Sequence, residues 1–118
     1  MAKKILVVDD DPAVVKYLKA LFEDNGYEVL SASDGAEALR ILDEITPDLI
    51  TLDLQMDQVW GPQFYRKMSK HPELKDKPVI VVSGLARPEL AIKKAAAVVS
   101  KPFDPDELLR IVREHIGV

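Results

Sequence analysis

The chain has 118 residues, of which 47% are hydrophobic and 31% are charged, a balance typical of one globular domain. Its formal net charge of −4 argues against direct binding to nucleic acid, which requires clustered lysine and arginine side chains. Because the chain has no cysteine, no signal-peptide pattern and no apolar run near the ~20 residues of a membrane helix, we expect a cytoplasmic protein without membrane insertion.

Five short apolar runs predict β-strands. Several of them pass through valine, isoleucine and leucine without polar alternation, as strands do when a parallel sheet is covered on both faces. In chain order, the runs are Ile5–Val8, Tyr27–Leu30, Leu49–Leu52, Val79–Val82 and Ala97–Val99.

Amphipathic patterns predict a helix after each strand. Apolar residues recur at helical spacing through positions 14–22, and Asn25-Gly26 then tolerates the left-handed conformation that ends a helix. The later helices are predicted from their starting residues. Asp34 with Glu37 forms a capping-box pair, and Pro62 and Pro88 can each open a helix. Asp104 with Pro105 is an acidic cap followed by a proline.

This alternation of strands and helices predicts an α/β fold. Right-handed crossovers between parallel strands place helices on both faces of one sheet. No internal repeat, low-complexity tract or linker divides the chain. We therefore expect residues 1–118 to form a single stand-alone domain, with no effector domain after Val118.

Polar residues follow four of the five predicted strands at once. Because the carboxyl ends of parallel strands meet at one edge of a sheet, we expect these residues to share a crevice there. They are Asp9-Asp10-Asp11 after the first strand, Asp53 after the third, Ser83 after the fourth, and Ser100-Lys101 after the fifth.

The residue types at this edge indicate phosphoryl transfer. Carboxylates held close together repel, so the cluster either binds a cation or takes up protons. The candidate ligands are hard oxygens, which favour Mg²⁺ or another hard divalent ion such as Mn²⁺. In such a site Asp53 is the candidate nucleophile, while Lys101 and Ser83 can bind the oxygens of the transferred group.

The ordered set of segments resembles the receiver domain of two-component response regulators over essentially the full chain, in the manner of chemotaxis-regulator-like single domains. The matching segments are ILVVDD (5–10), PDLITLDLQM (47–56), Gly61, PVIVVSG (78–84) and SKPF (100–103). This resemblance implies a doubly wound, flavodoxin-like (αβ)5 fold with a five-stranded parallel sheet in the order 2-1-3-4-5.

The resemblance also implies a signalling function. Asp53 would accept a phosphoryl group, in a Mg²⁺-dependent reaction, from a phosphohistidine on a sensor histidine kinase or a histidine phosphotransfer protein, and a downstream protein of unknown identity would respond. Such a module catalyses only its own phosphorylation and dephosphorylation and is not a metabolic enzyme. The implied metal ligands are Asp9 (through water), Asp10, Asp53 and the backbone carbonyl of Gln55. The implied phosphoryl-binding groups are Ser83 and Lys101.

Two parts of the chain depart from the family pattern. Asp57 and Trp60 replace the proline and the aspartate usual in the loop after the phosphoacceptor, and we interpret them as a solvated acid and a partly exposed aromatic. The segment between Ser83 and Lys101 is shorter than usual, which predicts a shortened fourth helix. Val98 stands in place of the family's switch aromatic, so the usual aromatic rotamer switch is not available to this chain.

Other interpretations remain open on the residues alone. A pseudo-receiver that binds partners without phosphorylation would suit the missing aromatic. Asp9-x-Asp11 after a strand resembles the nucleophile motif of haloacid-dehalogenase-like phosphatases, although Ala13 stands where that family has threonine or valine. A flavodoxin-like flavin carrier would share the fold but needs a phosphate cradle in place of the acidic first loop. The chain could also be an excised receiver of a longer regulator or hybrid kinase.

Overall fold

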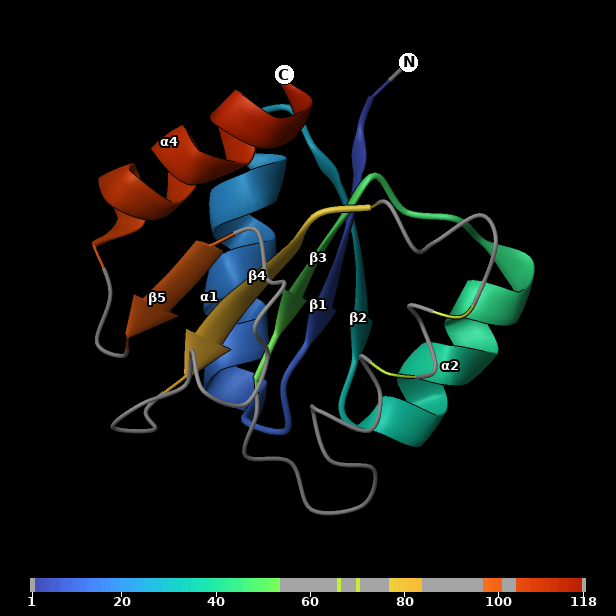
Figure 1. The fold of residues 1–118 in the computed structure, drawn as a ribbon. Coiled ribbons are helices and arrows are strands. Elements are labelled where there is room, and N and C mark those ends of the chain that lie inside the picture. Colours follow the sequence, from blue (N-terminus) through green and yellow to red (C-terminus); the bar gives the residue numbers. More distant parts are fainter. Residues whose placement is uncertain are drawn as a thin grey trace.

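A parallel sheet of five strands, in the order β2-β1-β3-β4-β5, organises the protein (Figure 1). The computed structural model describes residues 2–53, 66, 70, 77–83, 97–100 and 104–117, without the side chains of residues 83, 98 and 100. The strands are β1 (Lys4–Val8), β2 (Glu28–Ala32), β3 (Leu49–Leu52), β4 (Val79–Ser83) and β5 (Ala97–Ser100). All four strand pairs are parallel, which confirms the doubly wound α/β fold and its predicted strand order.

Helices cover both faces of this sheet. Within the described ranges they are α1 (Pro12–Glu23), α2 (Gly35–Glu44) and α4 (Pro105–Ile116). Figure 1 shows α1 and α4 on one face and α2 on the other. None of these helices combines the length and the apolar character needed to cross a membrane. The helices predicted from Pro62 and Pro88, including the shortened fourth helix, lie outside the described residues, apart from Arg66, which is helical.

Each inner strand contributes to two hydrophobic clusters, because successive residues of a strand point to opposite faces of the sheet. In β1, Leu6 and Val8 pack on the α2 side, whereas Ile5 and Val7 pack on the side of α1 and α4. All four side chains are buried. This two-sided burial is why the apolar run in the sequence is continuous rather than alternating.

The second strand differs from its prediction by one or two residues at each end. It was predicted at Tyr27–Leu30 and lies at Glu28–Ala32. Because β2 is an edge strand, its Glu28 and Ser31 side chains are exposed, and the apolar run underestimates its length. Tyr27, the residue before β2, belongs to the hydrophobic core instead. Its ring packs edge-on against Phe22, with 6.3 Å between ring centroids.

The turn between α1 and β2 is tied to the end of α4. Gly26 has a φ of 91°, the left-handed conformation predicted for this helix end. The Tyr27 hydroxyl donates a hydrogen bond of 2.5 Å to the carbonyl oxygen of Gly117, and Arg113 donates one of 2.8 Å to Asn25 Oδ1. Burial raises the pKa of Tyr27 above its usual 10.0, against an opposing effect of Arg113, so the hydroxyl keeps the proton that it donates.

Three aspartates start the three described helices. Each occupies the N-cap position and accepts a hydrogen bond from a backbone N–H of the first turn, which would otherwise lack a partner. The donor–acceptor distances are 2.9 Å for Asp11 in α1, 2.7 Å for Asp34 in α2 and 2.9 Å for Asp104 in α4. In α1 and α4 a proline follows the cap, so both helices begin with the same device.

Substituting the α4 cap tests this device. Asp104→Ala is expected to lower the free energy of unfolding by about 1 kcal/mol, because the N–H of Asp106 loses its acceptor. Urea denaturation of both proteins measures the difference. Asp104→Asn retains a side-chain oxygen and should cost much less. An equal loss in both variants would show that charge, rather than the capping hydrogen bond, is the stabilising feature.

Candidate functional site

The backbone of the sheet holds two of the predicted site residues directly beyond the ends of adjacent strands. Val8, the last residue of β1, pairs with Ala32 of β2 on one side and Leu52 of β3 on the other. The ladder then continues for one more step on each side. The N–H of Asp9 donates to the carbonyl oxygen of Ala32 at 3.1 Å, and the N–H of Asp53 donates to that of Val8 at 3.0 Å. Both acids therefore stand on backbone fixed by the sheet.

This placement brings three carboxylates together at the carboxyl edge of the sheet. One carboxylate oxygen from each of Asp9, Asp10 and Asp53 lies within 4.8 Å of the other two. Asp9 and Asp53 are only 3% and 4% exposed, whereas Asp10 is exposed. The cluster thus has two acids on its buried side and one at its mouth, as expected for residues contributed by strand ends.

Asp11 takes no part in this cluster. Its side chain caps α1, while its backbone N–H donates a hydrogen bond of 2.9 Å to Oδ1 of Asp9. The same residue therefore starts the helix and orients a neighbouring carboxylate. This backbone contact has no signature in the sequence, because any residue other than proline can supply it.

Electrostatic repulsion within the cluster is appreciable. Two unit charges 4.8 Å apart repel by about 1 kcal/mol at the dielectric constant of water and by about 3.5 kcal/mol at an effective value of about 20. A divalent cation relieves this repulsion. Oxygen ligands on opposite sides of a six-coordinate Mg²⁺ lie about 4 Å apart, so the three carboxylates fit around one such ion, with room for a water between one of them and the metal. Mn²⁺ suits the same oxygen donors.

The remaining predicted site residues are placed less completely. Ser83 is the last residue of β4, at the carboxyl edge, where it pairs with Ser100 of β5. The Ser83 side chain lies outside the part of the chain that the structure describes, and so do Gln55 and Lys101. The same holds for the departures from the family pattern, namely Asp57, Trp60 and the side chain of Val98.

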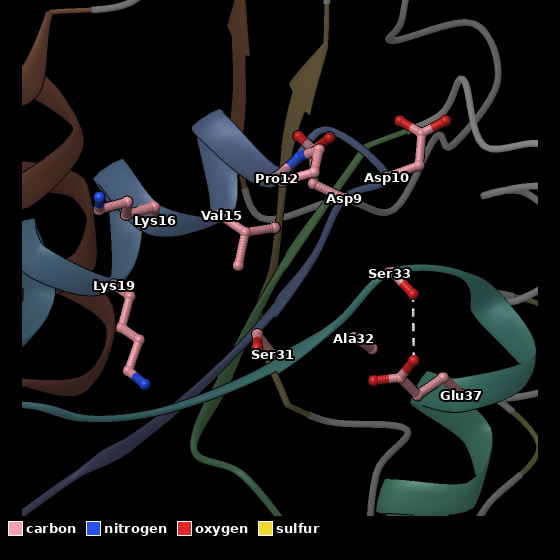
Figure 2. Close-up of a pocket in the computed structure, with 10 residues that line it drawn as sticks. All are labelled: Asp9, Asp10, Pro12, Val15, Lys16, Lys19, Ser31, Ala32, Ser33 and Glu37. Carbon is pink, nitrogen blue, oxygen red and sulfur yellow. Dashed lines mark hydrogen bonds between the residues drawn. The ribbon is translucent and has the colours of Figure 1, made fainter.

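A pocket adjoins the acidic cluster, and sequence reasoning did not anticipate it. Asp9 and Asp10 form one end of the pocket, and side chains from α1, from the end of β2 and from α2 form its walls (Figure 2). Three different elements contribute these residues, so no local pattern in the sequence could have marked them.

The exposed acid of the cluster offers a test of the repulsion. Asp10→Asn is expected to raise the free energy of unfolding by about 1 to 2 kcal/mol in metal-free buffer, because it removes two repulsive charge pairs in a largely aqueous environment. It should also reduce the stabilisation that added Mg²⁺ gives to the wild type. Urea denaturation with EDTA and with Mg²⁺ measures both effects.

The matched control is Asp43→Asn, which removes an exposed carboxylate from α2, away from the cluster. That variant should leave both the metal-free stability and the response to Mg²⁺ close to those of the wild type. A loss of metal-free stability in Asp10→Asn would contradict the repulsive interaction inferred from the geometry.

Comparisons with known proteins identify the family. A family model described as the response regulator receiver domain matches residues 5–113. Protein Rrf1 of Nitratidesulfovibrio vulgaris is 40% identical over 112 residues, which cover 95% of this chain and 81% of that protein. The polar-differentiation response regulator DivK of Brucella anthropi is 31% identical over 121 residues, which cover 99% of this chain and 98% of that protein.

A solved structure adds information about the site. The response regulator TrrA of Thermotoga maritima, determined in complex with Mg²⁺-BeF, superposes with a TM-score of 0.85 at 33% identity and covers 95% of this chain and 97% of that one. In this chain, the acidic cluster of Asp9, Asp10 and Asp53 is consistent with Mg²⁺-dependent phosphorylation of an aspartate.

These findings confirm the family inferred from the sequence motifs. A receiver domain implies a cognate histidine kinase as partner, and it is not a conventional enzyme. The family match, the sheet order and the three-carboxylate cluster agree with one another. The chain belongs to the response regulator receiver domain family.

Proposed function

We propose that Asp53 receives a phosphoryl group from a phosphohistidine on a sensor histidine kinase or a histidine phosphotransfer protein, and that this changes the binding of a downstream protein. One observation carries the proposal. The Asp53 carboxylate is 4% exposed, stands directly after the central strand, and lies within 4.8 Å of the carboxylates of Asp9 and Asp10. A nucleophile held on a rigid backbone beside two potential metal ligands suits phosphoryl transfer.

In the proposed reaction, a carboxylate oxygen of Asp53 attacks the phosphorus atom of the phosphohistidine. The P–N bond breaks, and the donor imidazole leaves with the bonding electron pair. When the other ring nitrogen of the donor carries a proton, this leaving group is neutral. The product on the receiver is an acyl phosphate, in which a new P–O bond joins the phosphorus to Asp53.

The other site residues have supporting roles in this proposal. Asp10 and Asp53 hold the metal directly, Gln55 through its backbone carbonyl, and Asp9 through a water, while Ser83 and Lys101 bind phosphoryl oxygens. Bound Mg²⁺, or Mn²⁺, supplies positive charge that offsets the carboxylates and the incoming anionic group. The oxygen donors in the cluster and the Mg²⁺-BeF complex of the related TrrA support this choice of metal.

The unit that performs this function is proposed to be residues 1–118 as one receiver domain. The family match over residues 5–113 supports that extent. We also propose that it acts in the cytoplasm. The lack of cysteine suits a reducing compartment, in which disulfides do not persist.

Acetyl phosphate, a small acyl phosphate, tests the chemistry without the cognate kinase. The protein is incubated with it in the presence of Mg²⁺, of Mn²⁺ or of EDTA, and its intact mass is then measured. We expect the mass to rise by one phosphoryl group with either metal and to stay unchanged with EDTA. Metal binding without any adduct would overturn the proposal and favour a pseudo-receiver that binds partners without phosphorylation.

A further inference from the structure

The pocket beside the acidic cluster is large enough for a small molecule. Its volume is about 380 Å³, within the range of roughly 300–1,000 Å³ that is usual for ligand pockets. Figure 2 shows Asp9 and Asp10 at one end, with α1 along one side and the β2–α2 connection across from it. The pocket therefore begins at the proposed metal site and extends between α1 and the edge strand β2.

Two lysines stand on the α1 side of this pocket. Lys16 and Lys19 lie three residues apart, so they share one face of the helix. Both are exposed, and in the part of the chain that the structure describes neither ammonium group has an ion-pair partner. Between the lysines and the opposite wall lie apolar surfaces, which include the side chain of Val15 (Figure 2).

The opposite wall carries a carboxylate that is already engaged. Glu37 accepts a hydrogen bond of 3.1 Å from the Ser33 hydroxyl, and Figure 2 shows this pair on the other side of the pocket from α1. The hydroxyl of Ser31 also lines the space. Hydroxyl groups can donate hydrogen bonds to an anion, so this side adds polar partners as well as one negative charge.

The charge of the lining depends on the metal. Three carboxylates, those of Asp9, Asp10 and Glu37, oppose the two ammonium groups of Lys16 and Lys19, so the lining without metal has a net charge of one negative unit. A divalent cation on the acidic cluster adds two positive charges, which it shares with Asp53, the third carboxylate of the cluster, and so makes the lining less negative. An anion should therefore bind more weakly without the metal than with it.

We propose that this pocket binds a small organic anion, with an apolar body against Val15 and its carboxylate or phosphate group held by Lys16 and Lys19. The metal-dependent part of the proposal rests on the proposed metal site. Because Asp9 and Asp10 line the pocket and also belong to the proposed metal site, the affinities of the anion and the metal are coupled, and each should raise the affinity of the other by the same factor. The pocket would thus link the state of the phosphorylation site to a metabolite-sized anion.

Phenylacetate is a suitable probe, with phenylacetamide as its uncharged counterpart of nearly equal shape. Amide ¹H–¹⁵N NMR spectra of the full chain are recorded during titration with each compound, with Mg²⁺ and with EDTA. We expect saturable shifts at Val15, Ser31 and Ser33 with phenylacetate, an affinity severalfold higher with Mg²⁺, and much weaker shifts with phenylacetamide. Shifts confined to Asp53 and its neighbours would show that the anion binds only to the metal and not in the pocket, which would overturn the proposal.

Substitutions of the lysines test the contacts directly. Lys16→Gln with Lys19→Gln should weaken phenylacetate binding about fivefold or more, since each exposed charge pair contributes up to about 1 kcal/mol. Lys4→Gln, at the amino end of β1, is the matched control and should change nothing. Equal affinity in the double variant, or equal binding of both compounds, would overturn the proposal.

A titration with Mg²⁺ alone separates the two proposals. Shifts at Asp10 and Asp53 report the metal site, whether or not an anion binds. If Mg²⁺ produces no shifts at Asp10 and Asp53, the proposed metal site and its coupling to the anion are both overturned. Phenylacetate binding in EDTA then still decides whether the pocket accepts an anion. If Mg²⁺ binds and phenylacetate does not, only the pocket proposal fails.

Discussion

Asp53→Asn is expected to abolish phosphorylation by acetyl phosphate in the presence of Mg²⁺. Asparagine has nearly the same shape, but its neutral amide has no anionic oxygen to attack phosphorus. The side chain is 4% exposed and its backbone is held by Val8, so the variant should keep the geometry while losing the chemistry. Intact mass should show one added phosphoryl group on the wild type and none on the variant.

Asp48→Asn is the matched control for this experiment. Asp48 lies just before β3, at the opposite end of that strand from Asp53, and its Oδ2 accepts a hydrogen bond of 2.8 Å from the backbone N–H of Lys4. An asparagine oxygen can accept the same bond, so the fold should survive and the adduct should form as in the wild type. A persistent adduct in Asp53→Asn would show that another acid, such as Asp10, accepts the phosphoryl group.

Phe22→Ala is expected to reduce the free energy of unfolding by about 3 to 5 kcal/mol, the usual cost of removing a buried aromatic ring. Phe22 is 0% exposed and joins the cluster between the sheet, α1 and α4. It also makes the edge-on contact with Tyr27, at an interplanar angle of 87°. Since small domains have roughly 5–15 kcal/mol of stability in total, this one substitution removes a large share of it. Urea denaturation monitored by circular dichroism measures the loss.

Phe22→Leu provides the graded comparison. It retains most of the apolar volume, so the expected cost is about 1 to 2 kcal/mol, from the smaller side chain and the lost ring contact with Tyr27. If alanine and leucine destabilised the protein equally, the cost would come from the ring contact alone and not from an unfilled cavity.

The inner strands were the most predictable part of the fold. Leu49–Leu52 was predicted at its observed bounds, and β1 and β4 were each predicted to within one residue. These strands are buried on both faces, so most of their residues are apolar and carry the signal. The edge strand β2 includes the exposed Ser31 and excludes the buried Tyr27. The apolar run therefore predicts both ends of this strand incorrectly.

The acidic cluster was predictable because strand direction alone gathers its members. Asp9 and Asp53 are 44 residues apart in the sequence, yet parallel pairing places both just beyond the same edge. The pairing of the Glu37 carboxylate with Ser33 was not predicted. The capping-box pattern correctly predicted that the Asp34 side chain accepts from the N–H of Glu37, but the Glu37 carboxylate accepts from the neighbouring hydroxyl. Such contacts depend on side-chain rotamers rather than on residue spacing.

The fixed backbone of Asp9 and Asp53 has a calorimetric consequence. Because the sheet already orders these two residues through hydrogen bonds to Ala32 and Val8, cation binding needs to order only the side chains at these two positions. Little apolar surface changes its exposure in that step, so the heat-capacity change of Mg²⁺ binding should be close to zero. The heat of binding should then be nearly independent of temperature, which distinguishes a preorganised site from one that folds around its ion.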